Sequence, residues 1–238
     1  MTFYRLHDRY PGFPDPREAE PNGLLAMGGD LSPQRLLNAY ARGIFPWFSE
    51  GDPPLWHCPD PRLVLFPNEF HVPRKLEKTL RKSPYEIRFD SNFQGVMEGC
   101  ALIQRPGQRG TWITQDMRKA YHRMHRLGFA HSVEAWEGDD LVGGLYGIAL
   151  GGVFFGESMF HRAPDASKAA LVSLVRFLQM KGFDLVDCQQ DTPHMRRFGA
   201  RLLSRDEFLD RLDRSLEQRE TLQGPWTRVA QDSLHGDL

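Results

Sequence analysis

The stretch VFFGESMFHRAPDASKAALVSLVRFLQMKGFDLVDCQ, residues 153–189, predicts a strand, a helix and a second strand in that order. Residues 153–160 are strand-like, and residues 183–189 are rich in apolar side chains, as is typical of a central strand. Between them, Asp165 can cap a helix that Gly182 ends. The core-facing positions of this helix are Leu171, Leu174, Val175 and Leu178. The whole unit is therefore expected to be a β-α-β crossover.

Two further strand-like runs precede this unit, at residues 130–136 and 141–150. The short turns between the runs predict an antiparallel meander that leads into the strand at 153–160. A helix with one apolar face is expected over 114–127, and a shorter, basic helix over 73–82. This order predicts an α+β domain with a mixed β-sheet flanked by helices. Acyltransferases of the GNAT type are built around such a unit, but a fold does not by itself fix a function.

The first sixty or so residues are rich in proline and glycine and contain one expected helix. Ser32 can cap that helix, Pro33 suits its first position, and Gly43 follows its end. This composition predicts a small, turn-rich N-terminal domain over residues 1–62, followed by a second domain over 63–238. The tail after about residue 218 is left without an assignment.

The composition of the chain narrows its function class. The 238 residues are 40% hydrophobic and 26% charged, as in a globular protein, and the net charge of -1 argues against non-specific coating of nucleic acid. No apolar run approaches the ~20 residues of a membrane span, and the N-terminus does not read as a signal peptide. We therefore expect a cytoplasmic protein that does not use a membrane.

The cysteines and histidines do not predict a metal site or a disulfide framework. Cys58, Cys100 and Cys188 lie far apart without a CxxC pair. The histidine pair at 122 and 125 lacks a third ligand, as does the His-Cys pair at 57 and 58. We expect neither a metal ion nor another cofactor.

Eight ordered blocks make the chain resemble the leucyl/phenylalanyl-tRNA–protein transferase family. The resemblance, which includes the sequence between the blocks, extends from about residue 13 to about residue 209 and so covers most of the chain. The blocks are EPNGLLAMGGDLSP (20–33), AYARGIFPWF (39–48), WHCPDPR (56–62), GTWI (110–113), GESMF (156–160), ASK (166–168), DCQ (187–189) and TPH (192–194).

The resemblance implies an enzyme that transfers Leu or Phe, and Met less well, from aminoacyl-tRNA to proteins that begin with Arg or Lys. That transfer marks the acceptor for degradation by the N-end rule pathway. The resemblance also implies a small N-terminal domain on a GNAT-like domain, and a monomer. The chain departs from the family pattern at His57, where tryptophan is usual, at His161, where serine is favoured, and at Asp165, where asparagine is usual. The tail, with Pro225 and Trp226, matches poorly.

Three residues are expected to carry the chemistry. Asp187 and Gln189 are two apart on one predicted strand, so their side chains should face the same way. Our hypothesis is that Asp187 draws on Gln189 to orient and activate the attacking amine. Glu157 lies in an apolar strand and needs a partner. It could recognise the acceptor terminus or the aminoacyl group, or form a structural salt bridge with Arg162 or Lys168.

The resemblance also assigns binding roles. An apolar pocket for the amino acid is implied by the requirement for Leu and Phe. Trp47 and Trp112 match positions that hold the terminal adenosine of tRNA, although either ring could simply pack in a core. The pocket residues implied are Leu145, Leu171, Leu174, Leu178 and Val186. The cations implied to contact tRNA phosphates are Arg74, Lys78, Arg81 and Lys82. A second set, Arg118, His122 and Arg126, shares one helix face and is left open.

Three other functions are alternatives for this sequence. The main alternative is a CoA-dependent GNAT-type N-acyltransferase, but the strand-to-helix junction at 160–168 contains a proline and no glycine for a pyrophosphate loop. The glycine-rich segment 105–110 reads as a loop. The second alternative is a cysteine hydrolase that uses Cys188 and His194. Nothing in the sequence indicates that Cys188 is a thiolate, and its side chain is expected to point into the core. The third alternative is a non-catalytic RNA-binding module, which is disfavoured because the chain contains no RNP-type aromatic strand motif.

Overall fold

The predicted β-α-β unit is present in the computed structural model, which describes residues 4–103, 111–227 and 230. It consists of β9 (Val153–His161), α5 (Ala166–Met180) and β10 (Leu185–Gln189). The two strands pair in parallel, with Val186 opposite Phe154. The crossover expected from the sequence is therefore confirmed.

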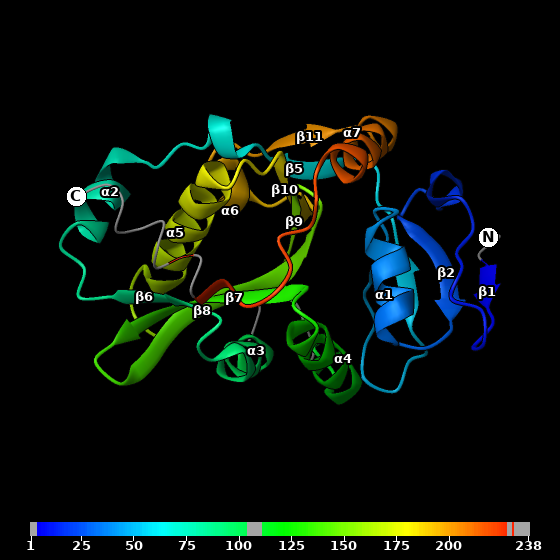
Figure 1. Ribbon diagram of the computed structural model, residues 1–238, viewed down its shortest axis with the longest axis horizontal. Helices are drawn as coiled ribbons and strands as arrows, with labels where there is room; N and C mark the ends of the chain where they lie inside the picture. The colour runs from blue at the N-terminus through cyan, green and yellow to red at the C-terminus, as the bar shows by residue number, and fades with distance from the viewer. Residues whose placement is uncertain (1–3, 104–110, 228–229, 231–238) are drawn as a thin grey trace.

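These strands belong to a seven-stranded mixed sheet in the order β11-β5-β10-β9-β8-β7-β6 (Figure 1). The meander predicted before β9 is confirmed, because β7, β8 and β9 pair antiparallel in sequence. The remaining strands of the sheet are β5 (Arg62–Leu65), β6 (Glu86–Phe89), β7 (Ala130–Glu137), β8 (Asp140–Leu150) and β11 (Arg201–Leu203).

Helices cover both faces of this sheet (Figure 1). One face packs on α3 (Phe93–Leu102) and α4 (Gln115–Arg126), through side chains such as Tyr146. The opposite face packs on α5, through side chains such as Leu145. Because successive strand residues point to opposite faces, the apolar strand β8 serves two cores. The other helical segments are η1 (Pro16–Glu18), η2 (Pro67–Glu69), α2 (Arg74–Leu80), α6 (Pro193–Arg196) and α7 (Arg205–Gln218).

The N-terminal part forms a separate four-stranded sheet, in the order β1-β2-β4-β3. Its strands are β1 (Tyr4–Leu6), β2 (Leu24–Gly28), β3 (Phe45–Pro46) and β4 (Leu55–His57). Helix α1 (Pro33–Tyr40) begins as expected, because the Ser32 side chain accepts a hydrogen bond from the backbone N–H of Arg35. One apolar cluster runs from α1 to α4 and α7, so the two sheets share a core. The domain boundary at residue 62 stays a prediction, as does the GNAT-like character of the larger part.

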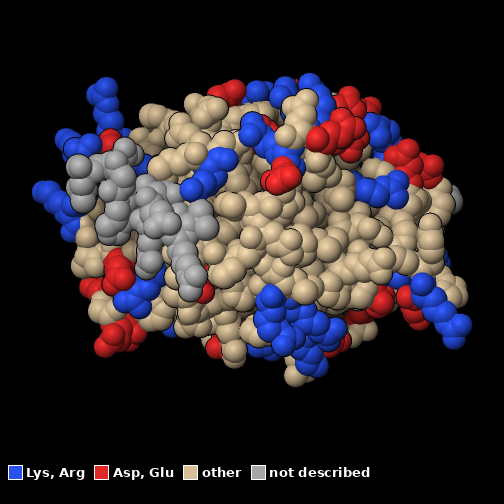
Figure 2. All heavy atoms as spheres, in the orientation of Figure 1, with Lys and Arg blue, Asp and Glu red and all other residues tan. Residues whose placement is uncertain are grey.

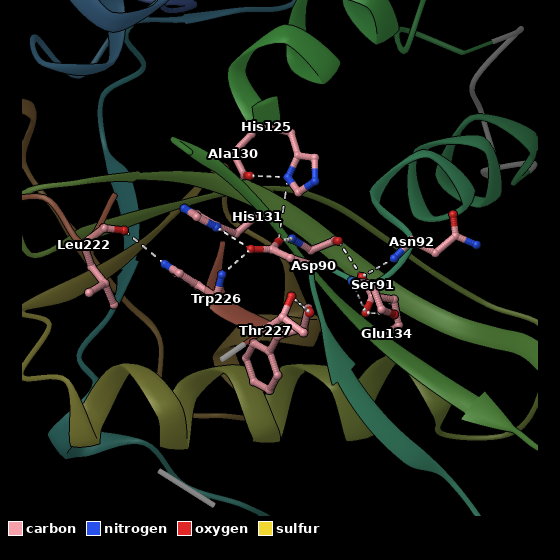
Figure 3. Close-up of polar contacts among 12 residues, drawn as sticks. Asp90, Ser91, Asn92, His125, Ala130, His131, Glu134, Leu222, Trp226 and Thr227 are labelled. Carbon is pink, nitrogen blue, oxygen red and sulfur yellow. Dashed lines mark hydrogen bonds and ion pairs between the residues drawn. The ribbon is translucent and has the colours of Figure 1, made fainter. Parts of the chain in front are cut away.

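The tail that the sequence left unassigned is built into the larger part as far as Thr227. The fully buried Trp226 ring stacks on His131 at a centroid distance of 3.8 Å. Its backbone N–H donates to Asp90 at 2.8 Å, and Asp90 also contacts Nδ1 of His131 at 2.9 Å. Figure 3 shows Asp90 between these two partners. The tail is therefore fastened to the end of β6 and the start of β7.

The capping role expected of Asp165 is wrong. The residue stands at the N-cap position of α5, but in the left-handed conformation with φ of 61°, and its side chain caps no backbone N–H. Its carboxylate instead pairs with Lys168 at 2.6 Å. Within the described ranges, none of the helices is both long and apolar enough to cross a membrane.

Candidate active site

The candidate site lies where β9 and β10 part. Their pairing ends with Asp187 opposite Phe155, although both strands continue. Beyond this point β9 and β10 diverge around a cavity of 590 Å³. The lining includes residues 156–159 of β9 and residues 188–190 at the end of β10. The carboxyl end of a parallel pair of strands is a common place for a binding site.

Glu157 reaches into this cavity and is held by three side chains. One carboxylate oxygen accepts hydrogen bonds from the Tyr40 hydroxyl at 2.7 Å and from the Gln189 amide at 3.0 Å. The other accepts one from the Tyr121 hydroxyl at 3.1 Å. The two tyrosine hydroxyls also contact each other. The partners come from α1, α4 and β10, so Glu157 is the point at which the N-terminal helix, α4 and the large sheet meet.

The surroundings of Glu157 change its acidity. The pKa of the carboxyl group is raised from 4.5 to about 7, mainly by removal from water and also by the nearby Asp187, while the hydrogen bonds from Tyr40, Tyr121 and Gln189 limit the rise. Burial also raises the pKa of Tyr40 and of Tyr121 well above the usual value, so both hydroxyls keep their protons. Glu157 is therefore a carboxyl group that can exchange a proton near neutral pH.

The alternative prediction, a salt bridge from Glu157 to Arg162 or Lys168, is wrong. Lys168 pairs with Asp165, and Arg162 donates to the backbone oxygen of Leu141 at 3.3 Å. The tyrosines that do hold Glu157 come from helices far away in the sequence. Tyr40 lies in an apolar stripe and Tyr121 on the apolar face of α4, so the sequence marked both as core. Neither carried a local signal of its link to Glu157.

Asp187 borders the cavity, but its carboxylate is turned away to Arg62 on β5. The Arg62 guanidinium donates to both carboxylate oxygens, at 2.8 and 2.6 Å, and both side chains are buried. Arg62 also lies between the rings of Phe45 and Phe208, at 4.9 and 4.5 Å from their centroids. Arg62 was not among the predicted site residues, although it ends the block at 56–62.

The expectation that Asp187 and Gln189 side chains face the same way fails because the strand is irregular. The register with β5 shifts between Asp187 and Gln189, and Gln189 has φ of 62°. Asp187 accepts a hydrogen bond from the backbone N–H of Gln189 at 2.9 Å, whereas the Gln189 side chain reaches Glu157. Cys188 lines the cavity instead of pointing only into the core. Burial raises the pKa of its thiol, which disfavours a thiolate nucleophile.

The inner part of the cavity is apolar. Four of the five predicted pocket residues line it, and Leu178 does not. Leu178 is buried further along α5, about one helical turn beyond Leu174 and away from the mouth. The apolar lining is made by Leu145, Phe154, Met159, Leu171, Leu174, Val186 and Met195. The last chain segment in this lining, around Met195, was not predicted because α6 is too short to show an apolar face.

Trp47 and Trp112 both line the cavity, on its aromatic side. Trp47 is 38% exposed, so its ring is not core. His57 lies behind it, at a ring distance of 5.6 Å, and also stacks on Phe45. Burial lowers the pKa of His57 to about 4, so its ring is neutral. The histidine that departs from the family pattern therefore still supplies an aromatic ring.

Polar side chains form another part of the cavity wall. Lys168, His161 and His194 all line the cavity. Burial lowers the pKa of His194, and the charges of Lys168 and neighbouring cations lower it further. The predicted phosphate-contacting set lies outside the cavity, exposed on or just after α2. In that set Arg81 pairs with Glu77 at 3.1 Å.

A metal-ligating cluster is not found in the described part of the chain, where no three His, Cys, Asp or Glu side chains could hold an ion together. The junction between β9 and α5 carries the carboxylate of Asp165 at the start of the helix. A negative charge at this position disfavours binding of a pyrophosphate. The glycine-rich segment 105–110 lies outside the described residues.

Comparison with known sequences gives two family matches. Residues 64–213 match the model for leucyl/phenylalanyl-tRNA protein transferase, and residues 29–60 match the model for the N-terminal domain of the same proteins. A leucyl/phenylalanyl-tRNA–protein transferase from Anaeromyxobacter sp. (strain K) is 60% identical over 226 residues, covering 95% of this chain and 96% of the relative. One from Myxococcus xanthus (strain DK1622) is 54% identical, covering 97% and 98%.

A solved structure, that of L-PGS from Bacillus licheniformis, is a more distant match. It covers 69% of this chain and 53% of the other at 10% identity, with a TM-score of 0.36. A likeness this low adds nothing to the argument on fold or function.

Proposed function

The chain belongs to the leucyl/phenylalanyl-tRNA–protein transferase family, and from that premise we propose that its reaction takes place at Glu157 and Gln189. The activity is the transfer of an amino acid from aminoacyl-tRNA to a protein. The observation that carries the placement is the partly buried contact between Glu157 and Gln189 in a cavity that also has apolar and aromatic lining.

The donor is proposed to be tRNA charged with Leu or Phe, and less well with Met. The apolar lining suits these side chains, since none of them has a polar group that needs a partner. Trp47 and Trp112 line the cavity and are proposed to stack on the terminal adenosine, a contact that contributes ~1–3 kcal/mol per stacked base. The exposed cations of the α2 region would contact phosphates, namely Arg74, Lys78, Arg81 and Lys82.

The acceptor is proposed to be a protein that begins with Arg or Lys, which the transfer marks for degradation by the N-end rule pathway. A cationic terminus needs a negative partner once it leaves water. Glu157 supplies an ionisable carboxylate at the cavity wall. A cytoplasmic location and a monomeric state stay predictions from the sequence.

The reaction needs little activation, because the donor is already an ester. The amine nitrogen attacks the ester carbonyl carbon, a C–N bond forms, and the C–O bond to the terminal ribose breaks. The proton lost by the amine ends on the released ribose oxygen. Terminal amines have a pKa of roughly 7.7–8.0. The pKa of Glu157 is about 7, close to that range, so its carboxylate can accept this proton and pass it on.

Asp187 is proposed to act as a positioning residue. Its carboxylate holds the Gln189 backbone N–H, and Arg62 holds the carboxylate. This chain of contacts fixes the irregular end of β10, so the Gln189 amide can bridge Glu157 and the incoming amine. In this proposal Asp187 does not activate the amine directly and acts on it only through Gln189, whose backbone N–H is the point of contact.

The proposed function is tested with purified protein, labelled Leu-tRNA and two peptides that begin with Arg or with Ala. Transfer to the Arg peptide alone, without ATP or CoA, is the expected result. Turnover of a CoA thioester, with no transfer from Leu-, Phe- or Met-tRNA, would instead support the CoA-dependent acyltransferase. Glu157→Gln and Cys188→Ala provide a matched pair of cavity variants, and only Glu157→Gln is expected to abolish transfer.

A further inference from the structure

The outer face of α4 is a basic surface. The face opposite its buried side chains carries a continuous set of exposed cationic and histidine side chains. They are Arg118, Lys119, His122, Arg123 and Arg126. Figure 2 shows a cluster of basic side chains at the lower edge of the molecule, where Figure 1 draws α4. The chain as a whole has a net charge of -1, so this surface is a local concentration of positive charge.

Most of these cations are not neutralised by the protein. The one acidic residue of the helix, Asp116, pairs with Lys119 at 3.5 Å. Within the part of the chain that the structure describes, Arg118, Arg123 and Arg126 take part in no ion pair. Three arginines on one helix face are thus available to an external anion.

Helix α7 shows what an ordinary solvated face of this protein looks like. Its arginines alternate with acidic residues, and Arg211 pairs with Glu207 at 2.9 Å. Mixed charges of this kind stabilise a helix by i,i+4 pairing and need no partner. The face of α4 lacks that pattern, and like charges on one helix face repel each other. The repulsion is relieved when a polyanion binds.

The basic face is rigidly connected to the candidate site. On the buried side of the same helix, Tyr121 donates to Glu157. At its start, Thr114 caps the helix, two residues after the cavity-lining Trp112. A helix is about 10–12 Å across, so the basic face lies roughly one helix diameter from the carboxylate. This distance is short enough for a donor whose aminoacyl end lies in the cavity to reach the basic face with its phosphates.

We propose that the outer face of α4 binds the phosphate backbone of the donor tRNA beside its aminoacylated end, an inference that rests on the proposed function. Arg118 and Arg126 are about 12 Å apart along the helix, long enough to meet more than one phosphate. Arginine is well suited to phosphate because its guanidinium can donate two parallel hydrogen bonds. The acceptor is a poorer occupant, since its proposed terminus is itself cationic and this face repels it.

The test uses the triple variant Arg118→Gln/Arg123→Gln/Arg126→Gln of the full chain. Transfer to an Arg peptide is measured with two donors, Leu-tRNA and the small ester leucyl-adenosine, over a range of salt concentrations. The variant is expected to raise the KM for Leu-tRNA about fivefold or more and to flatten its salt dependence by roughly 0.7–0.9 in log–log slope per lost phosphate contact. Transfer from leucyl-adenosine is expected to stay at the wild-type level, because this donor has no tRNA backbone.

Two controls sharpen the result. Arg214→Gln removes an exposed charge from the mixed face of α7 and is expected to leave both donors unaffected. Arg123→Lys keeps the charge and is expected to retain most of the affinity for Leu-tRNA. An unchanged KM and salt slope in the triple variant would overturn the proposal. An equal loss with leucyl-adenosine would also overturn it, because the change would then act through Tyr121 and the cavity. If wild-type protein transfers from neither donor, the proposed function fails first.

Discussion

Arg62 and Asp187, which are 125 positions apart in the chain, form a buried two-point ion pair that ties β5 to the end of β10. The contacts measure 2.8 and 2.6 Å, and 1% or less of either side chain is exposed. The pair also supports the site, because Asp187 accepts a hydrogen bond from the backbone N–H of Gln189. A carboxylate committed in this way positions its neighbours and has little freedom to bind substrate itself.

The variant Asp187→Asn is expected to destabilise the fold by about 3–5 kcal/mol, because it leaves the Arg62 charge buried without its counter-ion. Urea unfolding followed by circular dichroism measures the change. The exposed pair Arg196 and Asp191 provides the control, where Asp191→Asn should leave the free energy of unfolding nearly unchanged. If Asp187→Asn unfolds like the wild type and only turnover is lost, Asp187 acts chemically and is not a positioning residue.

The variant Glu157→Gln is expected to change how stability depends on pH. The pKa of Glu157 is raised from 4.5 to about 7 in the folded protein, so the folded state binds this proton more tightly than the unfolded state. The resulting stability is present below pH ~4.5 and is lost as pH rises through about 7, an effect of about 2–3 kcal/mol. The variant should therefore gain stability relative to the wild type between pH 5 and pH 8, as urea unfolding at both values measures.

The same residue is expected to shape the rate profile. Transfer by the wild type should rise with pH through about 7, as the Glu157 carboxylate loses its proton. The variant Glu157→Gln should lack both this rise and most of the activity. A stability difference that is constant from pH 5 to pH 8, or a rate rise that persists in Glu157→Gln, would contradict the assignment.

The variant Trp47→Ala is expected to weaken donor binding without unfolding the protein. Trp47 is 38% exposed, so its loss should change the free energy of unfolding by about 1 kcal/mol. Loss of a stacked base at ~1–3 kcal/mol should raise the donor KM roughly 5–150-fold. The rise should be similar for Leu-tRNA and leucyl-adenosine, unlike the effect of the α4 variant. Trp47→Phe should recover most of the affinity, and a normal KM in Trp47→Ala would remove Trp47 from the site.

The variant Trp226→Ala is expected to destabilise the protein by about 3–5 kcal/mol, because it leaves a cavity where a fully buried ring stacks on His131. The KM for either donor should not change, since Trp226 does not line the cavity at Glu157. Thermal unfolding and steady-state transfer at low temperature measure the two quantities. Trp136→Ala, at a partly buried ring that packs on Arg88, is the control and should cost less. A tail that only covers the surface would show equal, small losses in both variants.

Local sequence patterns were enough to predict the central elements of the fold, whereas α3, α7 and the short strands β5, β6 and β11 were not predicted. The crossover, the antiparallel meander, the Ser32 cap of α1 and the apolar face of α4 are all confirmed, because capping and side-chain periodicity act over a few residues. The ordered blocks were enough to indicate the family, which the family models and close relatives confirm. Four of the five predicted pocket residues do line the cavity.

The partners of the site were beyond local patterns. Tyr40 and Tyr121 read as core, and the sequence carried no sign that their hydroxyls meet at Glu157. The irregular end of β10 turned Asp187 to Arg62 and brought Cys188 to the cavity, against the expected strand alternation. Trp226 lies in the tail that the sequence left unassigned, and it is fully buried.

The sequence by itself determined the central strands and helices of the large sheet and the family to which the chain belongs, because those features depend on neighbouring residues and ordered motifs. Only the tertiary structure decided which polar groups share one buried site, since that depends on contacts between segments up to 125 positions apart. A buried carboxylate needs a partner, but its partner can come from any element that packs beside it. Glu157 accepts hydrogen bonds from two tyrosines and a glutamine, and Asp187 accepts them from an arginine.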